Sequence, residues 1–121
     1  MLANELIYDE PEILRRVSQG DETAFGYLFK HYFDHLYGFA ISVAKSSLLA
    51  EDIVQEVFAN VWRHREQLVE IEKFEGWIFV LTRNHAYKVI RREAKVPQFV
   101  GYLEASFALS PYSPEQRLFH R

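Results

Sequence analysis

One set of polar residues in the middle of the chain has the types and spacing of a protein-binding surface. Asp52, Gln55 and Glu56 stand three and four residues apart, so a helix would present them on one face. Two carboxylates and an amide in this arrangement can pair with basic side chains on a partner helix. Such charge complementarity favours correct register and fast association. The pattern therefore predicts a surface that binds a basic protein partner.

A second set is a stripe of cations that begins with an amide. Its members are Asn84, Lys88, Arg91, Arg92 and Lys95. On a helix these positions fall within an arc of about 100°. Cations on such a stripe can bind phosphates while the amide reads a base edge, which predicts a nucleic-acid surface.

Both patterns also have an explanation that needs no partner. Acids are favoured near the N-terminus of a helix and cations near its C-terminus, because of the helix dipole. Charged faces of helices also serve simply to keep a protein hydrated. The charge patterns alone leave binding and solvation open.

Other kinds of site find little support in the sequence. His31 and His35 share a helix face, but no HExxH or paired ExxH motif accompanies them, and no cysteine occurs. Glycine-rich phosphate loops and the GxSxG motif are missing too. We predict no metal, no cofactor and no enzymatic activity. Phe74, Trp77 and Phe79 could stack on unpaired bases, but core packing is the favoured interpretation.

Helices must position these residues. Apolar residues recur at helical spacing in four segments, which run from Asp9 to Gly20, Asp21 to Val43, Ala50 to Trp62 and about Phe74 to Lys95. The helical spacing of apolar residues is lost between Arg65 and Lys73, which predicts a loop. No segment shows the alternation of apolar and polar residues that is typical of a strand. We predict an all-α fold: a compact bundle of about four helices over residues 1–96, with an irregular linker over residues 97–121.

Composition supports a globular domain. The chain has 121 residues, of which 49% are hydrophobic, so it can bury a core. No apolar run approaches the roughly 18 residues that a membrane span needs, and the N-terminus does not read as a signal peptide. We therefore expect a cytoplasmic protein that does not bind membranes. The net charge of −3 argues against a generally basic coat but leaves local patches possible.

A family resemblance is carried by three segments: DETAFGYLFKHYFDHLYGFA, AEDIVQEVFANVWRHREQL and FEGWIFVLTRNHAYKVIRRE. In order and spacing they resemble region 2 of the extracytoplasmic-function (ECF) sigma factors of bacterial RNA polymerase. The likeness covers about Glu10 to Lys95, and the ordered set DIVQEVF, FxGW and RN is its most specific part. The ending SPEQRLFHR is similar to the family's linker towards a second helical domain, which reads the −35 element and is absent from this sequence.

The resemblance implies partners for both polar surfaces. Asp52, Gln55 and Glu56 match the positions that dock on the clamp helices of the polymerase's largest subunit. Asn84 matches the position that contacts the non-template strand of the promoter −10 element, and the cations after it match a face along the DNA backbone. The segment from about Arg65 to Lys73 matches the loop that captures a flipped base. An anti-sigma factor is implied as a further partner.

The expected function is therefore that of a transcription initiation factor, which binds core RNA polymerase and recognises and opens the −10 element. The alternative is a helical protein-interaction module, such as an adaptor or a regulator that mimics this domain, with no direct role on DNA. Salt-dependent binding to single-stranded DNA would separate the two.

Overall fold

The computed structural model describes residues 7–93, which form helices joined by short connections, with no strand in that range. Within residues 7–93, four α-helices and one 3-10 helix follow one another. They are α2 (Glu10–Ser18), α3 (Glu22–Ala44), α4 (Ser47–Arg63), η1 (Arg65–Glu70) and α5 (Phe74–Glu93). The all-α prediction is confirmed. Lys95 and the predicted linker over residues 97–121 lie outside the described residues.

The helix boundaries follow from the side chains that cap them. Asp9, Asp21 and Ser46 each accept a backbone N–H bond from the first turn of the next helix, at 3.1–3.3 Å. Gly20 adopts a φ of +92° after α2, a conformation that is easy only for glycine. Lys45 takes the left-handed conformation after α3, with a φ of +59°, and closes that helix by donating its N–H to Ile41. The helices capped by Asp9 and Asp21 begin where the sequence predicted, while α4 begins at Ser47, three residues before the predicted start at Ala50.

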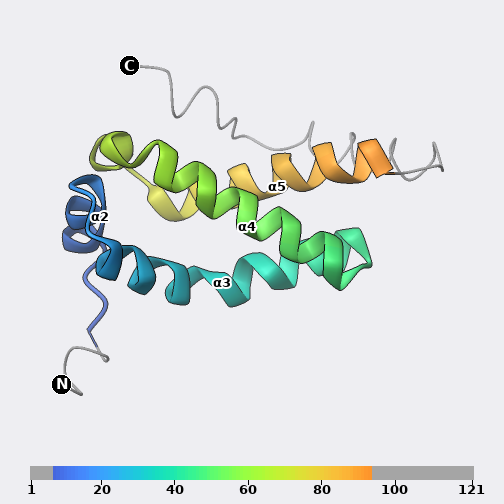
Figure 1. Ribbon diagram of the computed structural model, residues 1–121, viewed down its shortest axis with the longest axis horizontal. Coiled ribbons are helices and arrows are strands. Elements are labelled where there is room, and N and C mark those ends of the chain that lie inside the picture. Colours follow the sequence, from blue (N-terminus) through green and yellow to red (C-terminus); the bar gives the residue numbers. More distant parts are fainter. Residues whose placement is uncertain (1–6, 94–121) are drawn as a thin grey trace.

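The helices pack as a bundle around α4. Figure 1 shows α4 crossing between α3 and α5, with α2 at one end. α4 contacts α3 and α5, while α2 packs on α3 and on η1. The core includes several side chains that are fully buried, among them Leu28, Leu36, Ile53, Leu68, Trp77 and Ile78. Burying a side chain of this size contributes about 1.5–3 kcal/mol, so this core stabilises the bundle.

The segment from Arg65 to Lys73 differs from the sequence prediction of a loop. Residues Arg65–Glu70 form η1, and Leu68 at its centre has no exposed surface. Arg65 fixes the junction with α4, because its guanidinium donates a 2.8 Å bond to the carbonyl of Trp62 and lies 4.4 Å from the centre of the Trp62 ring. A 3-10 helix repeats every three residues, so a search for a 3.6-residue period overlooks it.

Candidate functional site

The outer face of α4 carries the first predicted set of residues. Asp52 and Gln55 are exposed, and the Glu56 side chain keeps 44% of its surface exposed. On the opposite side of the helix Ile53 and Val57 are at most 1% exposed. Since the apolar face is fully used by the core, the polar face is available to a partner.

Glu56 has a partner within the chain. Its Oε2 lies 3.0 Å from Nη2 of Arg63, which is two turns later on α4 and 54% exposed. The sequence-based set for this surface omitted Arg63. The signal was available, because residues seven apart return to nearly the same side of a helix. The carboxylate is therefore partly neutralised on its own surface.

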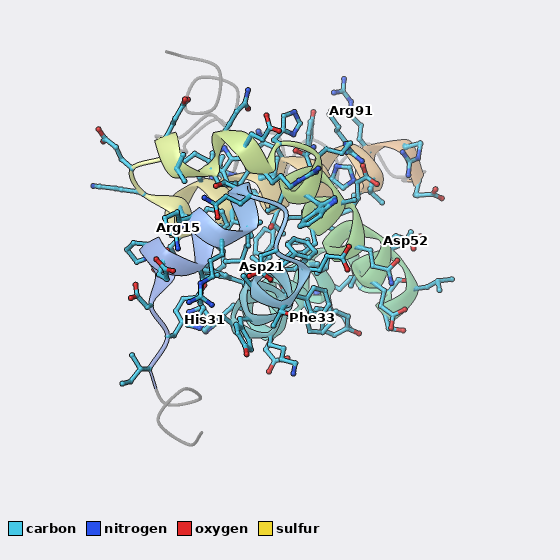
Figure 2. All side chains as sticks on the ribbon, turned by 60° about the vertical axis from the view of Figure 1, so that its left-hand side comes forward. Arg15, Asp21, His31, Phe33, Asp52 and Arg91 are labelled. Atoms are coloured by element: carbon cyan, nitrogen blue, oxygen red, sulfur yellow. The ribbon has the colours of Figure 1, made fainter. Side chains whose placement is uncertain are left out.

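The exposed part of the basic stripe lies in the second half of α5. Lys88, Arg91 and Arg92 are exposed, and Asn84 is half-buried one turn earlier. The guanidinium of Arg91 lies 5.3 Å from the centre of the Tyr87 ring. In Figure 2 Arg91 lies near the top of the molecule and Asp52 lies lower, on its right-hand side.

The first half of α5 is buried rather than open. Phe74 is 2% exposed and Trp77 is 1% exposed, and their rings contact each other at 5.6 Å. Phe79 is half-buried against the core. The core interpretation of these aromatics is therefore confirmed for Phe74 and Trp77, which cannot stack on bases without leaving the core.

His85 lies where α4 and α5 meet and was not assigned a role from the sequence. It is half-buried, and burial lowers its pKa below the ordinary value of 6.5. The carboxylate of Glu56 opposes this pKa shift. Three cations reinforce it: Lys88, Arg92 and Arg63. Charges on both α4 and α5 thus act on the His85 ring.

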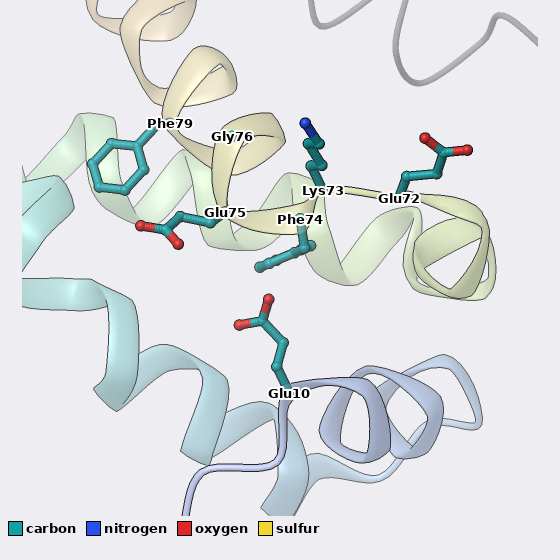
Figure 3. Close-up of a pocket in the computed structure, with 7 residues that line it drawn as sticks. All are labelled: Glu10, Glu72, Lys73, Phe74, Glu75, Gly76 and Phe79. Carbon is teal, nitrogen blue, oxygen red and sulfur yellow. The ribbon is translucent and has the colours of Figure 1, made fainter.

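An open hollow lies beside the start of α5. It is lined by Glu10, Glu72, Lys73, Phe74, Glu75, Gly76 and Phe79. Figure 3 shows the Glu10 carboxylate approaching Phe74 from α2, with Glu75 on the same side. Three carboxylates against one ammonium make the hollow acidic, so it is a poor site for phosphate. Within the described residues this hollow borders the segment predicted to capture a base.

His31 and His35, which we predicted not to bind a metal, contact aromatic rings. His31 is exposed and stacks on Tyr8, with ring centres 3.6 Å apart, while the ring of His35 lies 6.3 Å from that of Phe79. In the part of the chain that the structure describes, no group of three or more histidine, cysteine or acidic residues could hold a metal ion. None of the helices in that same part is long and apolar enough to cross a membrane.

The comparisons with known proteins point to one family. The family model for sigma-70 region 2 matches residues 28–96. The ECF RNA polymerase sigma factor SigK of Mycobacterium tuberculosis is 27% identical over 89 residues, which cover 70% of this chain and 46% of SigK. The RNA polymerase sigma factor CarQ of Myxococcus xanthus is 27% identical over 88 residues, covering 73% and 51% of the two chains.

A third similar protein is also named as a sigma factor. The ECF RNA polymerase sigma factor SigM of Bacillus subtilis is 29% identical over 68 residues, which cover 56% of this chain and 41% of SigM. The chain spans about half the length of the curated relatives it matches. No solved structure matches it significantly. Because the family model covers more than half of the chain, the chain belongs to the sigma-70 region 2 family.

Proposed function

We propose that this chain binds core RNA polymerase and recognises and opens the promoter −10 element. The relatives are named as sigma factors of RNA polymerase, and we transfer that role to this chain. The observation that carries the proposal is that α4 exposes an acidic face and α5, which packs on α4, exposes a basic face. The work would be done in the cytoplasm, with polymerase.

The polymerase surface in this proposal is formed by Asp52, Gln55 and Glu56. Their exposure on α4, opposite a fully buried apolar face, supports the assignment. The partner would be the clamp helices of the largest subunit, with basic side chains facing the two carboxylates. Small Ala59, half-buried one turn further, would let a partner helix approach closely.

The DNA surface in this proposal is formed by Asn84, Lys88, Arg91 and Arg92, continuing to Lys95. The cations would bind phosphates of the non-template strand, and Asn84 would contact a base. We assign the strand backbone to this half of α5 and not to the acidic hollow, where phosphates would be repelled. Opening DNA costs a few kcal/mol for each base that leaves the stack, and these contacts would return part of that cost.

Such a protein supplies binding energy and performs no chemistry itself. The resemblance also suggests an anti-sigma factor that covers the same two faces.

The experiment that tests the proposal is a pull-down of core RNA polymerase with the purified chain, followed by binding of single-stranded −10-like DNA. We expect capture of polymerase and salt-dependent binding of the strand. Capture of polymerase without strand binding would support the protein-interaction module instead. Failure to capture polymerase would contradict the proposal.

A further inference from the structure

The hollow beside the start of α5 holds three acids that have no basic partner in the described part of the chain. They are Glu10, Glu72 and Glu75. Within residues 7–93, no ion pair joins any of them to a basic side chain. By contrast, Glu12 and Glu56 each contact an arginine of their own helix, at 2.6–3.0 Å. The negative charge of the hollow is therefore available to a ligand.

The hollow also has an aromatic wall. Phe74 and the half-buried Phe79 line it, and Figure 3 shows the carboxylates of Glu10 and Glu75 on the same side as Phe74. Its volume of about 540 Å³ lies within the range of ligand pockets, roughly 300–1,000 Å³. Aromatic rings attract other rings as well as guanidinium groups. Such a hollow suits a segment that combines arginine with an aromatic residue.

One segment of this chain has that chemistry. Arg117–Arg121, which lies outside the described residues, has the sequence RLFHR. In an extended segment alternate side chains point the same way, so Arg117, Phe119 and Arg121 would share one side, about 6.6 Å apart from one to the next. An aromatic ring between two guanidinium groups complements an aromatic wall between carboxylates.

The length of the intervening chain suits this contact. Glu93 follows Glu75 by 18 residues of α5, which correspond to about 27 Å of helix. Arg117 follows Glu93 by 24 residues, and a flexible chain of that length has a root-mean-square end-to-end distance of about 27 Å. The effective concentration of a tethered ligand is highest when these two lengths match. Lys95 is only two residues beyond Glu93 and cannot reach the hollow.

We propose that the acidic hollow binds the segment Arg117–Arg121 of the same chain, with the two arginines at the carboxylates and Phe119 against the ring of Phe79. The contact is autoinhibitory, because any other ligand of the hollow must first displace this segment. The inference needs neither polymerase nor DNA. It can therefore fail while the proposed function stands, and the reverse also holds.

The test is paramagnetic relaxation enhancement, measured in NMR spectra of the full chain. The sequence contains no cysteine, so Ser113→Cys gives a single attachment site for a nitroxide label, four residues before Arg117. We expect the amide signals of Glu75 and Gly76, which line the hollow, to lose intensity when the label is paramagnetic. Reduction of the nitroxide should restore both signals.

Charge reversal identifies the groups that pair. Arg117→Glu together with Arg121→Glu should abolish the loss of intensity, because the segment would then be repelled by the hollow. Adding Glu72→Lys and Glu75→Lys should bring the loss back at Gly76. Both glutamates are exposed, so these substitutions should leave the fold intact.

The matched control reverses an acid outside the hollow. Glu66 is exposed on η1 and does not line the hollow, so Glu66→Lys should not restore the loss of intensity in the chain with reversed arginines.

Three results would overturn the inference. The first is an unchanged intensity of the Glu75 and Gly76 signals in the labelled chain. The second is a loss of intensity that persists after both arginines are reversed. The third is a loss that arises only in a mixture of spin-labelled chains with isotope-enriched chains that carry no label, because a second copy would then occupy the hollow.

Discussion

The hydroxyl of Tyr32 donates a 2.6 Å hydrogen bond to the carboxylate of Glu10, which joins the middle of α3 to the first turn of α2. Tyr32 is 4% exposed, and its ring also meets Phe74 of α5 edge to face. Burial, together with Glu10, raises the pKa of the Tyr32 hydroxyl, so this group remains a donor at any physiological pH. One residue thus links three helices.

Replacing Tyr32 by Phe should remove the bond and keep the ring. We expect a loss of about 1 kcal/mol in the free energy of unfolding, measured by urea denaturation, because water can reach the half-buried Glu10 and replace part of the bond. Tyr27→Phe is the matched control, since Tyr27 is 51% exposed on the same helix. Equal effects of the two substitutions would contradict the stabilising role of this hydrogen bond.

Leu68 should anchor η1 to the bundle. Leu68→Ala removes a side chain with no exposed surface, and we expect a loss of about 2–5 kcal/mol in the free energy of unfolding. Its neighbour Val69 is 55% exposed, and Val69→Ala should change stability by less than about 0.5 kcal/mol. A small effect of Leu68→Ala would mean that this segment is the loop predicted from the sequence.

Charge reversal at Glu56 should separate binding from folding. Glu56→Lys breaks only an exposed ion pair, which is worth about 0–1 kcal/mol, so melting should change little. Polymerase capture should weaken strongly, because a lysine would face a basic partner. Glu22→Lys, on the exposed first turn of α3, is the control and should leave capture intact. A collapse of melting in the Glu56 variant would refute the assignment of an accessible face.

The cations of α5 should determine how strongly the affinity for a DNA strand depends on salt concentration. Lys88→Ala and Arg91→Ala should each reduce the log–log salt slope by about 0.7 for a single strand. The measurement is fluorescence anisotropy of a labelled strand at several salt concentrations. Lys30→Ala removes an exposed cation from α3 and should leave the slope unchanged. A slope that responds equally to all three variants would indicate nonspecific attraction without a defined face.

Low pH should destabilise the packing of α4 against α5, because His85 becomes protonated. Burial lowers the pKa of His85 below 6.5, so the unfolded chain takes up this proton first as the pH falls. The contribution of neutral His85 to the free energy of unfolding is complete above pH 6.5. It is lost as the pH falls through the folded-state pKa of His85. His85→Gln should therefore flatten the fall of the free energy of unfolding below pH 6.5. An NMR titration that placed the folded-state pKa of His85 above 6.5 would contradict this prediction.

Much of this fold follows from local signals in the sequence. Asp9, Asp21 and Ser46 mark three helix starts because a short side-chain oxygen can accept a backbone N–H there. The face of α4 that carries Asp52 and Gln55 follows from the period of its apolar residues. Each of these features depends on neighbours within one or two turns, which sequence alone can supply.

The features that the sequence missed depend on packing between distant elements. η1 has only one inward residue, Leu68, so its pattern is too short to detect. The position of His85 against Glu56 requires knowing how α4 lies on α5.

The family match begins at Leu28, inside α3, and so excludes α2. Yet α2 buries Ile13, Leu14 and Val17 and packs on η1, the turn that joins the two helices with opposite charge. A fragment trimmed to the matched range would lack α2 and its contacts with η1. The relative position of α4 and α5 thus depends on a helix that lies outside the matched range.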